Sequence, residues 1–498
     1  MSSGAGKITI LGLGPGDPGL LTREAWEWLQ AIDELFVRTV HHPTLEGLPS
    51  SLRVISFDSY YEEGQRFEEV YARTVEEVLR LGRRPEGVSY AVPGHPLVAE
   101  ATTPEILRRA RQEGIPVRVI EGISFLEPAF NALGIDPFPQ LTVADALEIG
   151  NRYFPPFVPD QPVLIGQIYS KETASQLKLT LMELYPDDHP VKLVHAAGTP
   201  EERVESLPLY QIDRSPHLGL LTALYVPPLG EHTSFESLEE IVAHLRAPEG
   251  CPWDREQTHA SLSPNLLEET YEVLDAIDGG NASAMTEELG DLLLQIVLHA
   301  QIASEEGEFR MTDVLNGIED KLVRRHPHVF GSVKVTGASE ALRNWERIKE
   351  AEREDAGEDR RRGMLSGVPK ALPALAQAQA VQDRAARVGF DWEDISGVEE
   401  KVREETGEFR AAEGDERRAE EFGDLLFSLV NLARWQHIDA EDALRGAVRR
   451  FRQRFEHIEQ GARDSGRALD ELSLQEMDAL WDEAKHHGDG AQGNGSSG

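Results

Sequence analysis

One acidic pattern occurs twice in the second half of the chain, and this repeat limits the folds open to it. The pattern E-E-x-x-E begins at Glu268 and again at Glu404, and each copy is followed by E-x-x-D, at Glu288 and at Glu421. Residues three or four positions apart share one face of an α-helix, so each pattern places its carboxylates on one side of a helix. The repeat therefore predicts two helical modules of the same kind in succession.

The carboxylates of each module are expected to meet between two antiparallel helices. In the first module the short turn at residues 279–281 would join these helices. Carboxylates gathered in this way repel each other unless a cation lies among them, and oxygen-only ligation selects a hard cation, Mg²⁺ or Mn²⁺. Mg²⁺ usually shares its shell with substrate phosphates, so the pattern indicates a phosphate ester. The expected metal ligands are Glu269, Glu272, Glu288 and Asp291, and Glu405, Glu408, Glu421 and Asp424.

Cationic and aromatic side chains repeat downstream of each acidic pattern. A lysine or arginine pair four residues apart can clamp polyphosphate oxygens, and a tryptophan can stack on a base, although an aromatic residue at this spacing is also common in a core. Two histidines flank Pro327 and are expected to cap and pack rather than to bind a metal. The candidate substrate-binding residues are Lys321, Arg325, Trp345, Lys349, Arg450, Arg454, Trp481 and Lys485.

The first 230 residues have a different sequence pattern. Apolar runs typical of β-strands alternate with amphipathic helical patterns, and this alternation predicts an α/β domain. Three of these runs end in glycine-containing loops, and α/β sheets bind ligands at the carboxyl ends of their strands. Glycine lets a ligand approach backbone amides closely, although a tight turn also explains such a loop. The candidate ligand-binding residues are Gly12, Gly14, Pro15, Gly16, Asp17, Pro93, Gly94, His95, Gly122 and Ser124.

Changes in composition predict the domain limits. The expected divisions are an α/β domain at 1–230, a helical module at 231–350, a charged linker at 351–372, a second module at 373–486 and a disordered tail at 487–498.

Composition narrows the range of partners. The net charge of −38 opposes general affinity for nucleic acid, whose phosphates would be repelled. The one cysteine, Cys251, excludes an intramolecular disulfide, and the chain shows neither a secretion signal nor an apolar run long enough to span a membrane. We therefore expect a cytoplasmic protein without a membrane partner.

Residues 234–485 resemble the MazG family of all-α nucleoside triphosphate pyrophosphatases. The resemblance rests on the strings at 251–259, 267–273, 290–293, 324–331 and 431–434. It implies a helical bundle, generally dimeric, that uses Mg²⁺ to hydrolyse a nucleoside triphosphate to the monophosphate and pyrophosphate. It also implies that the eight acidic residues named above are metal ligands and that one glutamate per site orients or deprotonates the attacking water. The candidates for that role are Glu268 or Glu269 in the first module and Glu404 or Glu405 in the second.

The two modules differ in one respect. The stretch from Cys251 to His259 has no counterpart in the second module, where Phe390-Asp391-Trp392 stands instead. Relatives with two modules often keep one competent site, and we favour the second module as the active one.

Residues 6–228 resemble the tetrapyrrole (corrin/porphyrin) methylase family, through the three glycine loops. This resemblance implies S-adenosylmethionine bound between two α/β lobes. Gly94-His95-Pro96 stands where relatives acting on corrinoids commonly have Gly-Asp-Pro, so the methyl acceptor stays open. Two other functions also stay open: a methyltransferase whose helical half serves mainly dimerisation, and a nucleotide sensor without turnover.

Overall fold

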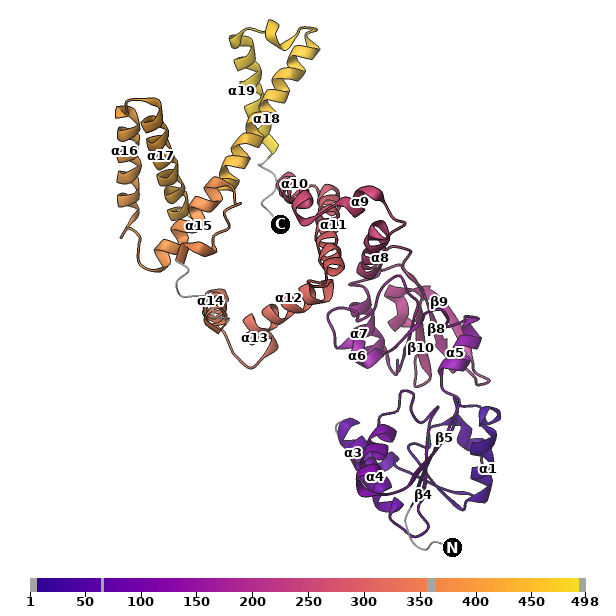
Figure 1. Ribbon diagram of the computed structural model, residues 1–498. Coiled ribbons are helices and arrows are strands. Elements are labelled where there is room, and N and C mark those ends of the chain that lie inside the picture. Colours follow the sequence, from indigo (N-terminus) through magenta and orange to yellow (C-terminus); the bar gives the residue numbers. More distant parts are fainter. Residues whose placement is uncertain (1–6, 64–66, 356–363, 492–498) are drawn as a thin grey trace. The chain divides into compact units, whose positions relative to one another are not determined.

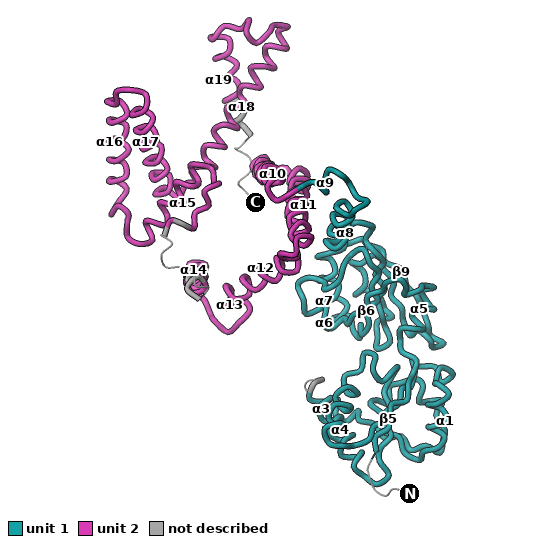
Figure 2. Tube along the Cα trace, in the orientation of Figure 1, with its two compact units in different colours: residues 1–257 teal, residues 258–498 magenta. Residues whose placement is uncertain are grey.

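The computed structural model describes residues 7–63, 67–355 and 364–491. These residues form two compact units, 1–257 and 258–498, which Figure 2 shows in different colours. The first unit combines sheets with helices, and the second consists of helices (Figure 1). The predicted fold class, an α/β domain followed by an all-helical region, is therefore confirmed.

The first lobe of unit 1 is built on a parallel sheet of five strands in the order β3-β2-β4-β1-β5. Helix α1 (Arg23–Ala31) packs on one face, where Ala25 and Leu29 are fully buried, while α3 (Phe67–Gly82) and α4 (Thr102–Glu113) pack on the other (Figure 1). Coverage on both faces explains why every residue of β1 is buried. The strands are β1 (Ile8–Gly12), β2 (Glu34–Val37), β3 (Arg53–Ser56), β4 (Val88–Val92) and β5 (Val117–Ile120), and a short helix, α2, spans Asp58–Glu63.

The second lobe contains a mixed sheet of five strands in the order β6-β7-β10-β8-β9. Only β6 and β7 run parallel; the other neighbours are antiparallel. Helices α6 (Ala146–Gly150) and α7 (Lys171–Leu181) pack on one face and α5 (Leu126–Leu133) on the other. The strands are β6 (Thr142–Asp145), β7 (Val163–Gly166), β8 (Pro190–His195), β9 (Arg203–Pro208) and β10 (Thr222–Val226). The two-lobed architecture that the sequence predicts is thus present.

Unit 2 contains two helical hairpins that carry the two copies of the acidic pattern. The first pairs α10 (His259–Gly279) with α11 (Ala282–Glu306), and the second pairs α16 (Ile395–Ala411) with α17 (Asp415–Trp435) (Figure 1). The remaining helices are α12 (Met311–Arg325), α13 (Pro327–Phe330), α14 (Ala338–Asp355), α15 (Ala374–Arg387), α18 (Ala440–Asp464) and α19 (Leu474–Ala491).

Local capping explains the sharp turn of the first hairpin. Helix α10 is followed by its C-cap, Gly280, which adopts the left-handed conformation that glycine accepts without a steric cost. The next residue, Asn281, caps α11 because its side-chain oxygen accepts hydrogen bonds from the amides of Ser283 and Ala284. The cap of one helix is thus followed directly by the cap of the next, and the two helices fold back on each other.

The compact units divide the chain at 257/258 rather than at the expected domain limit of 230. Helices α8 (Phe235–Arg246) and α9 (Pro252–Glu256) belong to the first unit, and Ser234, the N-cap of α8, donates a hydrogen bond to Asp160 of the second lobe. The expected linker begins inside α14, and α19 continues to Ala491. Residues 356–363 and 492–498, within the expected linker and tail, lie outside the described residues. The other predicted limits stay predictions.

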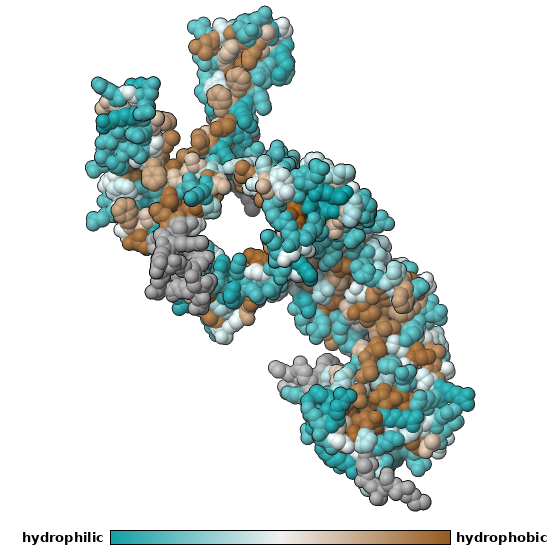
Figure 3. Space-filling model, in the orientation of Figure 1, coloured by the Kyte–Doolittle hydropathy of each residue, from teal (hydrophilic) through white to brown (hydrophobic). Residues whose placement is uncertain are grey.

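Apolar side chains reach the surface of unit 2 in rows at helical spacing (Figure 3). Each of the following is more than a third exposed: Leu289, Leu293 and Ile296 on α11, Leu315, Ile318 and Leu322 on α12, Phe422 and Leu426 on α17, and Leu444, Val448 and Phe451 on α18. Such rows usually face another surface. Within the described ranges, no helix is both long and apolar enough to cross a bilayer.

Replacing the cap of α11 is expected to loosen the hairpin locally. Asn281→Ala removes both side-chain hydrogen bonds and should cost about 1 kcal/mol, which corresponds to roughly fivefold faster amide exchange. Hydrogen–deuterium exchange of the first turn of α11 measures this, and Asn281→Ser, which keeps an acceptor, is the control. Equal exchange in the two variants would contradict the capping role.

Candidate functional site

The first hairpin brings three of the four predicted metal ligands together. One carboxylate oxygen from each of Glu269, Glu272 and Glu288 lies within 4.8 Å of the others. The first two lie one turn apart on α10, and the third faces them from α11 across the hairpin. Oxygens around one Mg²⁺ stand about 3–4 Å apart, since each Mg–O distance is about 2.1 Å. The set therefore fits a hard divalent ion.

Asp291 lies beside this set rather than within it. Its charge contributes to raising the pKa of both Glu269 and Glu288, so it is a near neighbour. Its oxygens are nevertheless outside the group that converges within 4.8 Å, and its side chain is one methylene shorter than that of glutamate. The role of Asp291 as a ligand stays a prediction.

Burial and neighbouring like charges both raise the pKa values of the first set. Burial, followed by the charges of Asp291 and Glu272, raises the pKa of the Glu269 carboxyl. Burial, followed by Glu272 and Glu287, raises the pKa of Glu288. Among the described residues, no lysine, arginine or histidine forms an ion pair with these carboxylates. Their repulsion is the condition that a bound cation relieves.

The second hairpin repeats the arrangement and adds fixed cations. Oxygens of Glu405, Glu408 and Glu421 converge within the same 4.8 Å, while Asp424 is again outside the converging group. Lys401 Nζ lies 2.7 Å from Glu405 and 3.1 Å from Glu404. These bonds, the one to Glu405 first, raise the pKa of Lys401.

Sequence comparison of the two modules explains their difference in charge. Lys401 stands four residues before Glu405, and the equivalent position before Glu269 is Asn265. Similarly, Arg417 lies 3.7 Å from Glu421, and the equivalent of this arginine in the first module is Ala284. Our sequence prediction did not include Lys401, although its i−4 spacing from Glu405 was a visible signal.

The two catalytic candidates in each module differ in burial. Glu269 is half-buried and Glu405 is buried, with one carboxylate oxygen that has no hydrogen-bond partner among the described residues. Glu268 and Glu404, their preceding neighbours, are exposed. The more buried member of each pair is the one whose oxygen belongs to the converging set, and the exposed member lies at its edge.

The predicted substrate-binding residues gather on other helices. Arg325 lies 2.7 Å from Glu352 and 5.4 Å from the ring centre of Trp345, which Lys349 approaches to 4.7 Å. Lys321 contributes to the low pKa of Glu352. This set is therefore brought together on α12 and α14.

In the second module the equivalent set lies on α18 and α19. Arg454 lies 5.6 Å from the ring of Trp481, which also packs edge-on against Phe451. Lys485 pairs with Asp482, and Arg450 is exposed on α18. The sets are thus formed, but on helices other than those carrying the carboxylates, and substrate binding stays a prediction.

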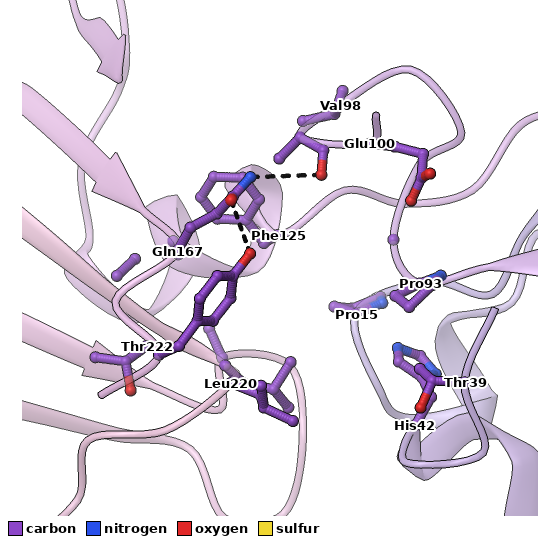
Figure 4. A pocket seen from close by; sticks show the side chains of 18 of the residues that line it. Pro15, Thr39, His42, Pro93, Val98, Glu100, Phe125, Gln167, Leu220 and Thr222 are labelled. Atoms are coloured by element: carbon purple, nitrogen blue, oxygen red, sulfur yellow. Dashed lines mark hydrogen bonds between the residues drawn. The ribbon is translucent and has the colours of Figure 1, made fainter. Parts of the chain in front are cut away.

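Unit 1 contains a cavity of about 200 Å³ at the carboxyl ends of the first lobe's strands. Four of the predicted ligand-binding residues, Gly14, Pro15, Pro93 and Gly94, line it. Figure 4 shows Pro15, Thr39, His42 and Pro93 on one side and Gln167, Leu220 and Thr222, from the second lobe, on the other.

The other predicted ligand-binding residues do not line this cavity. An added Cβ on Gly12 would fall 2.7 Å from the Cα of Gly122 and closer still to the oxygen of Gly94, so these glycines allow the three loops to pack together. The remaining predicted residues make local contacts: Gly16 packs on Thr199, Asp17 accepts a bond from the Gly19 amide, His95 Nδ1 accepts one from the Leu97 amide, and Ser124 bonds to Glu127.

Buried charges that the sequence analysis did not identify also line the cavity. Arg38 follows strand β2 and pairs with Glu100, whose side chain is 1% exposed, and this carboxylate contributes to the raised pKa of the guanidinium. Burial lowers the pKa of His42 to about 4, and its Nδ1 has no hydrogen-bond partner in the described structure. The end of β2 is a fourth strand end at the same edge, but it has no glycine to mark it.

Backbone strain also concentrates here. Ala99 and Gln167, which line the cavity, have φ values of 53° and 67°, and Ala196, at 48°, precedes another lining residue. Left-handed backbone at residues other than glycine is costly, and it clusters at sites where a ligand is held. The side chain of Gln167 bonds to Tyr169 and to the backbone oxygen of Ala99, which connects the two lobes across the cavity.

Comparisons with known proteins match both halves of the chain. Residues 7–213 match the Tetrapyrrole (Corrin/Porphyrin) Methylases, and residues 257–330 match the MazG nucleotide pyrophosphohydrolase domain. An uncharacterized protein of Bacillus subtilis, YabN, is 45% identical over 97% of this chain and 99% of its own length. The nucleoside triphosphate pyrophosphohydrolase/pyrophosphatase MazG of Thermotoga maritima is 46% identical over 50% of this chain and 95% of its own. The nucleoside triphosphate pyrophosphohydrolase of Escherichia coli is 44% identical over 50% and 96%.

Removing one carboxylate from the first set should stabilise the metal-free protein. A carboxyl whose pKa is raised in the folded state binds more protons when folded than when unfolded. The free energy of unfolding therefore falls as pH rises from the unfolded pKa of about 4.5 through the higher folded pKa. Glu269→Gln should therefore raise the melting temperature near neutral pH in EDTA, whereas added Mg²⁺ should stabilise the unaltered protein more than the variant. The control is Glu319→Gln, at an exposed position on α12. A lower melting temperature for Glu269→Gln in EDTA would contradict the repulsion.

Proposed function

The chain belongs to the family of MazG nucleotide pyrophosphohydrolases, with a tetrapyrrole methylase domain at residues 7–213, and we propose a function for its helical half. This half hydrolyses nucleoside triphosphates to the monophosphate and pyrophosphate. The observation that carries this proposal is the convergence of three carboxylates in each of two hairpins. Dimerisation does not require like charges to be gathered at a cost, so that alternative explains the structure less well, while release of pyrophosphate distinguishes turnover from nucleotide sensing.

Magnesium fits the two acidic sets. All six converging ligand atoms are carboxylate oxygens, which favour Mg²⁺ or Mn²⁺ over softer ions. When bound, the ion supplies Lewis-acid polarisation of the α-phosphate and neutralises its charge. The glutamates would hold the ion, and we propose that Glu269 and Glu405 orient or deprotonate the attacking water, with Glu268 and Glu404 as alternatives.

The second module is the one we propose to turn over substrate. The polyphosphate is strongly anionic, and the carboxylates of the first set repel it because they have no paired cation among the described residues. In the second set Lys401 and Arg417 offset part of the negative charge. An ion bound at the second set therefore leaves less residual repulsion for the incoming phosphates. Arg450, Arg454, Trp481 and Lys485 are the proposed substrate contacts there, and Lys321, Arg325, Trp345 and Lys349 are their equivalents in the first module.

A homodimer through the helical modules is proposed from the exposed apolar rows. On α18, Leu444, Val448 and Phe451 follow helical spacing and are each about half exposed. A second copy that covers these rows and those of α11, α12 and α17 would bury them as a bundle core does.

The first unit is proposed to bind S-adenosylmethionine in its cavity. Gly94 has open space where a Cβ would stand, so the backbone is accessible at the cavity wall, and the unpartnered Nδ1 of His42 offers a buried polar contact. When bound, the cofactor supplies a transferable methyl group. The acceptor stays open.

The products of hydrolysis test the main proposal. Incubation of the full chain with each nucleoside triphosphate and Mg²⁺ should release pyrophosphate, and EDTA should abolish the release. Release of orthophosphate instead would contradict cleavage at the α-phosphate.

Paired variants test which module works. Glu405→Gln with Glu408→Gln should lower kcat/KM by about 100-fold or more, or about 3 kcal/mol, because the ion loses two ligands. Glu269→Gln with Glu272→Gln is the matched control and should leave most activity. The reverse result would move turnover to the first module, and full activity in both would contradict the metal assignment.

Filling the cavity tests cofactor binding without an activity assay. Val98→Trp places a large side chain at the cavity wall and should weaken S-adenosylmethionine binding, measured by calorimetry, by about tenfold or more, or roughly 1.4 kcal/mol. Val143→Trp, at an exposed position on β6 outside the cavity lining, is the control. Binding that is unchanged in Val98→Trp would place the ligand elsewhere.

A further inference from the structure

The first hairpin carries a histidine pair that hydrolysis at the acidic sets does not use. His259 is the first residue of α10, and His299 faces it from α11. Their rings stack with centroids 5.0 Å apart and planes within 5°, and their Nδ1 atoms lie 2.7 Å apart. His259 ends the stretch from Cys251 that has no counterpart in the second module.

Two carboxylates complete a group around His259. Glu306 is the last residue of α11, and Glu308 follows the left-handed cap at Gly307. One ligand atom from each of His259, Glu306 and Glu308 lies within 4.8 Å of the others. The start of α10 and the end of α11 thus present imidazole and carboxylate groups to one another.

The histidine pair is incompletely satisfied by its protein contacts. A hydrogen bond between two neutral imidazoles uses one hydrogen, and the buried Nε2 of His299 has no hydrogen-bond partner among the described residues. The contact between the two Nδ1 atoms holds the His259 ring in place and leaves the Nε2 of His259 as the atom that could face a metal.

We propose that His259, Glu306 and Glu308 form a site for one divalent transition ion of the zinc class, separate from the magnesium sets, and that His299 holds the His259 ring in position. One imidazole nitrogen and two carboxylate oxygens, with a water in the fourth position, suit Zn²⁺, whose ligand distances of about 2.0–2.2 Å place neighbouring ligand atoms roughly 3.3 Å apart. The two carboxylates neutralise the ion, so the filled site carries no net charge.

The position of this group gives it a structural role. His299 stands eleven residues after Glu288 on the same helix, which is about 16 Å along the axis at 1.5 Å per residue. The ion would therefore join the two helices at the end of the hairpin opposite the turn. Fixing that end would hold α10 and α11 in the register that brings Glu269, Glu272 and Glu288 together.

The second module provides an internal contrast. The residue ten before Glu405, as His259 is ten before Glu269, is Ile395, and the residue eleven after Glu421 is Leu432. Neither side chain can bind a metal. The site is therefore confined to the first module, and one ion per chain is expected.

Zinc titration of the full chain tests the proposal. After removal of metals with a chelator, Zn²⁺ added in a millimolar excess of Mg²⁺ should raise the melting temperature, and the unaltered chain should hold one more Zn²⁺ than His259→Gln does. Co²⁺ in place of Zn²⁺ should give visible absorption bands of imidazole ligation. Absence of tight zinc binding under these conditions overturns the proposal.

Variants identify the ligands. His259→Gln should weaken zinc binding by about 100-fold or more, and His299→Gln by about 10–100-fold, because it removes an outer-shell partner of the ligand. Glu308→Gln, at an exposed position after α11, should weaken it without disturbing the fold. The matched control is Glu305→Gln, which removes the same charge from the residue next to Glu306 and should leave the affinity unchanged. Unchanged affinity in His259→Gln with His299→Gln, or an equal loss in Glu305→Gln, overturns the assignment.

Discussion

Mutual repulsion of carboxylates held across a helical hairpin is the constraint on which the second half of this protein depends. Three glutamate oxygens within 4.8 Å are stable only because the helices that carry them are packed elsewhere along their length. On α11 the buried residues run from Gln295 to Ala303, beyond the acidic positions, so the core half of the helix holds the acidic half in place. The raised pKa of Glu269 reflects its burial and the remaining repulsion from Asp291 and Glu272.

The two modules relieve that repulsion in different ways. In the second, Lys401 forms ion pairs with Glu404 and Glu405, so the chain itself supplies part of the counter-charge. The first has Asn265 at the equivalent position, and its carboxylates form no ion pair among the described residues, so a bound cation would have to relieve their repulsion. Duplication of one motif has therefore left one site with internal cations and another that depends more on an external ion.

Much of this arrangement follows from sequence spacing alone. Glutamates at i and i+3 must share a helix face, so the convergence of Glu405 with Glu408 was predictable from the sequence, and so was their approach to Glu421 once a short turn was assumed. The position of Asp424 beyond the converging group was not predictable, because it depends on side-chain length and on the rotation of α17. Lys401 was predictable in principle, since the same i−4 rule places it beside Glu405.

The cavity of unit 1 contains residues that their spacing in the sequence does not predict. Glycine loops marked the edge of the sheet at which the cavity lies, but Gly12 and Gly122 pack on each other's backbone. Arg38 and Glu100 come from segments 62 residues apart and meet only through the fold, so no local pattern connects them. Burial and pairing, which decide that His42 is neutral and Arg38 charged, are properties of the assembled lobes and have no signature in the chain.

A hydrolase of this kind must bring cations to the phosphates that its carboxylate-bound ion holds, and within one chain the two groups lie on different helices. Arg325 and Lys349 surround Trp345 on α12 and α14, while their module's carboxylates lie on α10 and α11. The rows of exposed apolar residues lie on α11 and α12, between those two groups in the order of the chain. Burying these rows against a second copy would exclude water from the helices beside the carboxylates, and electrostatic attraction between ion, phosphate and guanidinium strengthens as water is excluded. The same apolar side chains that make an isolated chain unfavourable in water would then make the site effective once they are covered.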